Sequence, residues 1–95
     1  MDKTKALIVI GGGLLSYKTF EECNNLGIET ILVDGNSECF CHRCASYFIQ
    51  ASTKEPDIVL PQVKKFISSH RKDMDILGVY TQGCDCNYAT LLEHQ

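Results

Sequence analysis

The chain has 95 residues, of which 44% are hydrophobic, and its formal net charge is −3. This length allows a single domain, and the nine Lys and Arg residues are scattered, so the composition excludes a basic nucleic-acid-binding surface. The longest apolar run is too short to cross a bilayer, and residues 1–5 lack the apolar segment of a secretory signal. We therefore expect a cytoplasmic protein that contacts neither nucleic acid nor membrane.

An apolar run followed by three glycines stands near the start of the chain. Residues 5–10 are predicted to form a strand buried on both faces, because the run is rich in β-branched residues and has no polar break. Gly11, Gly12 and Gly13 follow directly, and glycine allows a sharp turn and close approach of a ligand to the main chain. A helix predicted over 14–26 adds free N–H groups, which completes an anion-binding corner. Its expected sheet-facing residues are Leu15, Phe20, Cys23 and Leu26.

Strands and helices alternate along the rest of the chain. The predicted elements are strands over 29–33, 46–51 and 76–80, a helix over 57–70, and a last helix from Asp85 toward residue 93. The segment 38–45 has no clear periodicity and is predicted to be a loop with one helical turn. Pro61 is expected to be tolerated only near the first turn of its helix, because it lacks an N–H group.

This alternation predicts an α/β fold with an open parallel four-stranded sheet in the order 3-2-1-4. The order reverses between the first and fourth strands, and ligands of such sheets bind beyond the carboxyl ends of the strands at that point. Three loops are expected to converge there, over residues 11–13, 34–36 and 81–85.

The order and spacing of these segments resemble the N-terminal domain that precedes the ATP-binding lobes of ATP-grasp enzymes, such as carbamoyl phosphate synthase and biotin carboxylase. The resemblance rests on four stretches that together cover nearly the whole chain: residues 6–13, 26–36, 44–53 and 77–85. It implies a three-layer Rossmann-like domain that occupies residues 1–95. It also implies that the chain is a fragment of a longer enzyme or one part of a split enzyme.

The same resemblance implies a function for the domain. It would be the substrate-side part of an ATP-dependent ligase, inactive alone and without a cofactor of its own, while ATP and Mg²⁺ bind to the missing lobes. The partners would be these lobes, in the same or a split protein, and a small-molecule acceptor substrate. The residues implied to bind substrate or hold the surrounding loops are Gly11, Gly12, Gly13, Asp34, Asn36, Thr81 and Asp85.

An alternative function is a Rossmann-type nucleotide-binding regulatory module. The fingerprint G-x-G-x-x-G requires a third glycine, and Ser16 stands at that position. Asp34 does lie about twenty residues on, at the end of the second predicted strand, where a ribose-binding acid belongs. On the motif alone, a tight turn without a nucleotide is favoured.

The six cysteines raise a further alternative, a metal or redox module. The candidate metal ligands fall in two segments that follow strand ends: Cys39, Cys41 and Cys44 with His42 in the first, and Cys84 with Cys86 in the second. Together they could supply soft ligands for zinc or an iron–sulfur cluster. The Cys-x-Cys spacings are not the usual Cys-x-x-Cys knuckle, so free thiols and substoichiometric zinc are the favoured expectation.

The fourth predicted strand is expected to form an edge of the sheet. Ile76, Leu77, Val79 and Tyr80 are apolar, and no lysine or proline interrupts the strand. Because unprotected edges pair with other chains, we expect a homodimer through this strand and the last helix.

Overall fold

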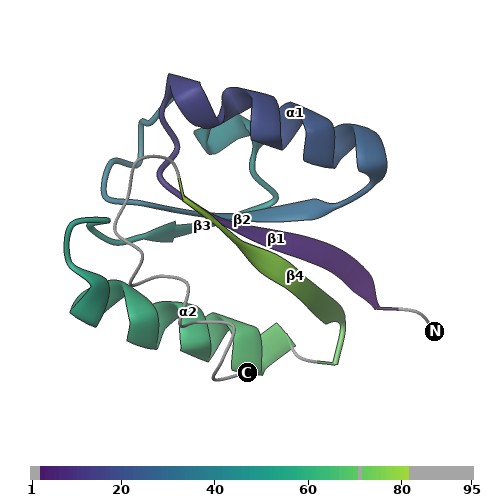
Figure 1. Cartoon of the computed structure of the whole chain (residues 1–95). Coiled ribbons are helices and arrows are strands. Elements are labelled where there is room, and N and C mark those ends of the chain that lie inside the picture. Colours follow the sequence, from purple (N-terminus) through teal and green to yellow (C-terminus); the bar gives the residue numbers. More distant parts are fainter. Residues whose placement is uncertain (1–2, 71, 82–95) are drawn as a thin grey trace.

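The computed structural model describes residues 3–70 and 72–81, and these form a three-layer α/β domain (Figure 1). Its strands are β1 (Thr4–Ile10), β2 (Glu29–Asp34), β3 (Tyr47–Gln50) and β4 (Met74–Thr81). Its α-helices are α1 (Tyr17–Leu26) and α2 (Pro56–His70), and two 3₁₀ segments are η1 (Leu14–Ser16) and η2 (His42–Cys44). The predicted last helix lies outside the described residues.

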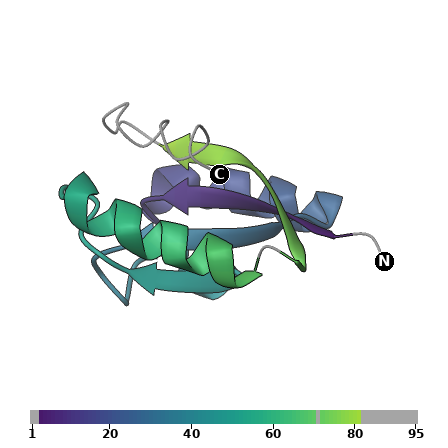
Figure 2. The same cartoon turned by 90° about the horizontal axis from the view of Figure 1, so that it is seen from below.

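The four strands form a parallel sheet in the order β3-β2-β1-β4, which confirms the predicted order. β1 lies beside both β2 and β4, so the glycine turn after β1 stands at the centre of the carboxyl edge. Figure 2 shows β3 and β4 at opposite edges of the sheet, with one helix on each face. Helices on both faces explain why β1 and β2 are continuous apolar runs.

Side chains from β1 alternate between two cores, one on each face of the sheet. Ile8 and Ile10 pack with α2 residues such as Val63, whereas Val9 packs with Phe20 of α1. Each of these side chains is fully buried. The strand therefore stabilises both helix layers, which fixes the turn that follows it between them.

The first helix differs in two ways from the prediction over 14–26. It begins with the 3₁₀ turn η1 and continues as α1, and Leu26 is 74% exposed instead of facing the sheet. At 3.6 residues per turn, Leu26 lies about 120° around the helix from the buried Phe20. Cys23 is buried as expected, and the side chain of Leu15 is not described.

The second helix corrects the expectation for Pro61. α2 begins at Pro56, so Pro61 lies in its second turn and not in its first. Pro61 is on the exposed face, where the carbonyl left without an N–H partner can bind water. Ile58 is also 49% exposed, while Val59, Val63 and Ile67 form the buried stripe.

Within the described ranges, no helix has the length and apolar character needed to cross a membrane.

Candidate functional site

The glycine loop, Gly11–Gly13, turns sharply at the carboxyl end of β1. Gly11 has a φ of 94°, which strongly favours glycine, and its N–H donates to the Val33 carbonyl at 2.8 Å. Its carbonyl accepts a hydrogen bond of 2.9 Å from the hydroxyl of the buried Ser16. The residue that replaces the third glycine of the fingerprint therefore braces the turn.

Asp34 connects the glycine loop to the loop that follows β2. One carboxylate oxygen accepts the Gly12 N–H at 2.8 Å, and the other accepts the Asn36 N–H at 2.8 Å. The Asn36 side chain in turn accepts the Glu38 N–H at 2.9 Å. Each carboxylate oxygen thus accepts one main-chain N–H, and together these bonds fix the orientation of the carboxyl group.

The segment between β2 and β3 packs against the glycine loop through its cysteines. The Cys41 N–H donates to the Gly12 carbonyl at 2.9 Å, and its thiol donates to the Gly13 carbonyl at 3.3 Å. The Cys39 sulfur lies so close to Gly12 that a Cβ atom there would be 2.8 Å away. Gly12 is therefore required for close packing between the two loops.

The start of the first helix carries hydrogen-bond donors that remain unused. In the part of the chain that the structure describes, the N–H groups of Gly13 and Leu14 donate no hydrogen bond to another residue. Gly13 is exposed, and both groups belong to the first turn of the continuous helical segment η1–α1. Such donors, together with the positive end of the helix dipole, favour an anionic ligand group.

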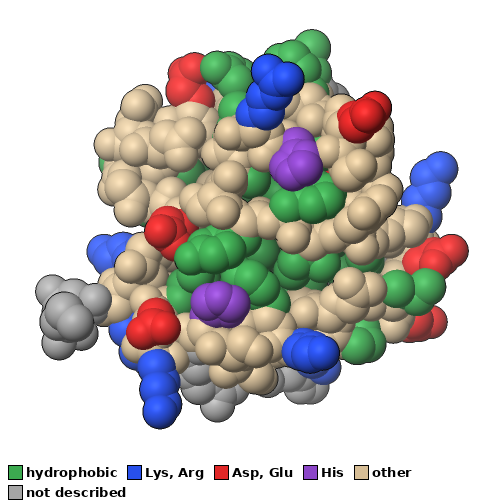
Figure 3. Space-filling model, turned by 180° about the vertical axis from the view of Figure 1, so that it is seen from behind, with side chains coloured by type: hydrophobic (Ala, Val, Ile, Leu, Met, Phe, Trp, Pro, Cys, Tyr) green, Lys and Arg blue, Asp and Glu red, His purple; other side chains and the backbone are tan. Residues whose placement is uncertain are grey.

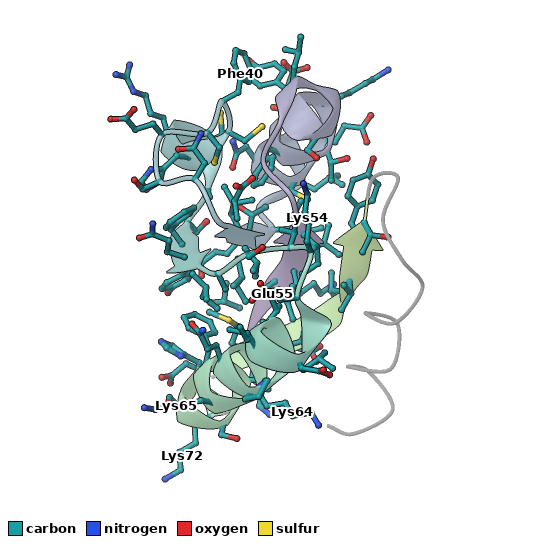
Figure 4. All side chains as sticks on the ribbon, turned by 90° about the vertical axis from the view of Figure 1, so that its left-hand side faces the viewer. Phe40, Lys54, Glu55, Lys64, Lys65 and Lys72 are labelled. Atoms are coloured by element: carbon teal, nitrogen blue, oxygen red, sulfur yellow. The ribbon has the colours of Figure 1, made fainter. Side chains whose placement is uncertain are left out.

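Lys54 is a candidate site residue that the sequence interpretation missed. Figure 4 looks onto the carboxyl ends of the strands, and Lys54 extends from the β3–α2 connection across this edge toward the layer that contains α1. Lys64, Lys65 and Lys72 lie at the opposite side of this view, around α2. Only the topology could have indicated Lys54, because its loop reaches the carboxyl edge through the end of β3.

The remaining predicted site residues are placed only in part. Thr81 ends β4 beside Ile10, so it does reach the carboxyl edge next to the glycine loop. Asp85, Cys84 and Cys86 lie outside the described residues. Across residues 3–70 and 72–81, no group of three or more His, Cys, Asp or Glu side chains is arranged to hold a metal ion.

The cysteine segment borders an open hollow of about 680 Å³, lined in part by Tyr17, Cys39, Phe40 and Cys44. Burial and the neighbouring Cys44, Cys39 and Asp34 raise the pKa of the Cys41 thiol to about 11. Cys41 is therefore a neutral thiol at physiological pH, as its hydrogen bond to Gly13 requires. Its Cys-x-x-Cys spacing to Cys44 is a second signal that the sequence interpretation missed.

Another hollow, of about 650 Å³, lies between β3 and α2, away from the glycine loop. Figure 3 shows hydrophobic side chains gathered around a histidine on this part of the surface. His70 stacks on Phe66 with ring centroids 4.1 Å apart, and Tyr47 contacts both rings. These contacts join α2 to the edge strand, and none of the predicted site residues lines the hollow.

No protein-family model matches the chain, and comparison with curated proteins finds no match. Solved structures of N5-carboxyaminoimidazole synthetase from Staphylococcus aureus are similar in fold. For the complex with ADP, the TM-score is 0.65 at 18% identity, over 100% of this chain and 23% of that chain. For a second structure of this synthetase, the TM-score is 0.65 at 21% identity, over 99% of this chain and 25% of that chain. The chain therefore spans about a quarter of the synthetase and shares the fold of that part.

Proposed function

We propose that this chain is the substrate-side domain of an ATP-grasp ligase and that its glycine loop binds an anionic group of a small-molecule acceptor. The observation that carries the proposal is the pair of N–H donors on Gly13 and Leu14 at the carboxyl edge, which donate no hydrogen bond to another described residue. The fold likeness to N5-carboxyaminoimidazole synthetase over the whole chain supports it. ATP and Mg²⁺ would be bound by lobes in the same or a split protein.

The proposed position of the anion follows from which main-chain N–H groups of the glycine loop already have an acceptor. The Asp34 carboxylate accepts the hydrogen bond of the Gly12 N–H, so the N–H groups of Gly13 and Leu14 are the donors that remain for a ligand. Lys54 would add a positive charge from the opposite loop and would neutralise part of the ligand charge. Gly11 and Ser16 would hold the turn in the binding conformation without touching the ligand.

Three further parts of the proposal rest on the resemblance to ATP-grasp enzymes: the kind of parent enzyme, its location, and the residues on the β4 side of the site. The parent enzyme would be similar to carbamoyl phosphate synthase, it would be cytoplasmic, and the isolated chain would not catalyse ligation. Thr81 and Asp85 would complete the acceptor site from the β4 side. The nucleotide-binding alternative is disfavoured because Ser16, which braces the turn, stands where the fingerprint requires a third glycine.

The test is an NMR titration of the ¹⁵N-labelled full chain with ribose 5-phosphate and, separately, inorganic phosphate. We expect the largest amide shifts at Gly13 and Leu14, and binding that weakens as salt is added. Lys54→Gln should weaken binding about two- to fivefold, since an exposed cation contributes ~0.5–1 kcal/mol. Lys64→Gln removes the same charge from α2 and is the matched control, with no expected effect.

Three outcomes would contradict the proposal. The first is an absence of shifts at the glycine loop at millimolar phosphate ester, and the second is an equal effect of Lys54→Gln and Lys64→Gln. The third is tight binding of NAD or an adenine nucleotide at the glycine loop, which would favour the nucleotide-binding module instead.

A further inference from the structure

Cys41 and Cys44 have the backbone geometry of a pair that can form a disulfide. The Cys44 N–H donates to the Cys41 carbonyl at 2.9 Å, and Cys41 is the N-cap of the 3₁₀ segment η2. A 3₁₀ turn rises about 2 Å per residue and places side chains three residues apart on the same face, so the two Cα atoms are roughly 6 Å apart. Disulfides span Cα separations of about 4.4–6.8 Å, so the pair can close without a large backbone movement.

The two thiols differ in their access to solvent. Cys41 is fully buried and donates its hydrogen to the Gly13 carbonyl, whereas Cys44 is half-buried and lines the open hollow beside Phe40. Figure 4 shows sulfur atoms gathered beneath the labelled Phe40. A small oxidant would therefore reach Cys44 before Cys41, and Cys41 would act as the second thiol, which completes the disulfide.

We propose that Cys41 and Cys44 are a redox-active dithiol whose reversible disulfide controls the hydrogen bond between the cysteine segment and the glycine loop. The oxidant is a low-molecular-weight disulfide. The Cys44 thiolate attacks one of its sulfurs, forms a mixed disulfide and releases one thiolate. Cys41 then loses its proton to solvent, and its sulfur displaces the second small thiolate as the Cys41–Cys44 bond forms.

The step balances as a two-electron exchange. The protein loses two thiol hydrogens, and one small disulfide becomes two small thiols. A sulfur in a disulfide has no hydrogen to donate, so oxidation removes the 3.3 Å bond from Cys41 to the Gly13 carbonyl. The main-chain bond from the Cys41 N–H to Gly12 does not depend on the thiol. Oxidation therefore changes the hydrogen bonding of the glycine loop mainly at Gly13.

This inference rests on the contact between Cys41 and Gly13 and not on the proposed ligand. Its test is oxidation of the full chain by glutathione disulfide at pH 8, followed by thiol counting and peptide mapping. We expect the six thiols of the chain to fall to four, a Cys41–Cys44 link in the mapped peptides, and full reversal by dithiothreitol. The amide resonance of Gly13 should shift on oxidation and return on reduction.

Matched variants separate the dithiol from the other cysteines. Cys39→Ser should still lose two thiols, whereas Cys44→Ser should form no intramolecular link and show no oxidation-dependent shift at Gly13. Cys41→Ser keeps a hydroxyl donor for the Gly13 carbonyl, so its Gly13 resonance should stay constant under both conditions. If Cys44→Ser does not fold, Cys44→Ala takes its place and should likewise form no intramolecular link.

Several results would overturn the inference. One is a link that joins Cys39, Cys23, Cys84 or Cys86 in place of the Cys41–Cys44 pair. Another is a stable mixed disulfide on Cys44 that never resolves. A third is a Cys41–Cys44 disulfide that leaves the Gly13 resonance unchanged, which would refute the control of the glycine loop.

Discussion

Replacing Gly12 by alanine tests the packing between the glycine loop and the cysteine segment. A Cβ atom at this position would lie 2.8 Å from the Cys39 sulfur and 2.9 and 3.0 Å from the two δ-carbons of Leu32. Leu32 is fully buried, so it cannot turn into solvent to make room. Overpacking of this kind costs about 1–3 kcal/mol of unfolding free energy.

The matched control is Gly13→Ala in the next position. A Cβ atom at Gly13 would meet nothing within 4 Å, and its φ of −74° suits any residue. Since alanine also restricts the unfolded chain, Gly13→Ala should be neutral or stabilising by about 0.4–1 kcal/mol. Both variants should be compared with wild type by urea unfolding and by melting followed with circular dichroism. Each kcal/mol lost should lower Tm by roughly 4–8 °C in a domain of this size.

The double variant Gly12→Ala/Cys39→Ala sharpens the test. It removes the closest atom but leaves Leu32, so it should recover only part of the stability lost in Gly12→Ala. Equal stability of Gly12→Ala and Gly13→Ala would refute the reasoning, because it would show that the two loops are not closely packed at Gly12.

Four other predictions concern the same loops and the sheet edge. Asp34→Ala should cost about 1–3 kcal/mol in urea unfolding because the Gly12 N–H loses its acceptor, and Asp34→Asn should cost less; a loss below ~0.5 kcal/mol in Asp34→Ala would contradict this. Between pH 9 and 11 the unfolding free energy should fall, because the thiol of Cys41 ionises in the unfolded chain before it does in the folded chain, where its pKa is about 11. Cys41→Ser should reduce this fall of the unfolding free energy with pH, and an unchanged slope would argue against the role of the Cys41 thiol. The isolated chain should hydrolyse no ATP above a buffer blank, and turnover that survives rigorous purification would disprove this. Light scattering at micromolar concentration should show a dimer that Leu77→Lys, at an exposed position of β4, dissociates, whereas a monomer unaffected by that change would mean that the β4 edge is protected.

The order of the strands was predictable because it depends on patterns that are visible in the sequence itself. Apolar runs mark buried strands, and the helix between β1 and β2 requires a parallel crossover of fixed hand. Gly27 ends α1 at a φ of 73°, as its position after the helix indicated. The placement of the glycine loop at the carboxyl edge followed from that order alone.

The contacts within the site were less predictable, because they depend on how loops meet in space. Asp34 stands where a ribose-binding acid would stand, and only the structure shows both of its oxygens bonded to main-chain N–H groups. Lys54 appeared in the sequence as part of a polar turn, and its position at the carboxyl edge depends on the path after β3. Leu26 was misplaced because it lies about 120° around α1 from the buried Phe20, so its side chain does not face the sheet.

The register shift between β1 and β4 has a consequence for aggregation. Ala6 pairs with Ile76 and Leu7 with Gly78, so Leu77 is an extra residue and is 47% exposed. Because of this extra residue, the side chain of Val79 packs in the same core as Ile76, and that of Tyr80 packs in the core on the opposite face. A bulge bends a strand and interrupts any regular ladder along it. Beyond this point only the short stretch 78–81 continues the regular ladder of β4, and so short a stretch disfavours the long, open-ended stacking of fibrils.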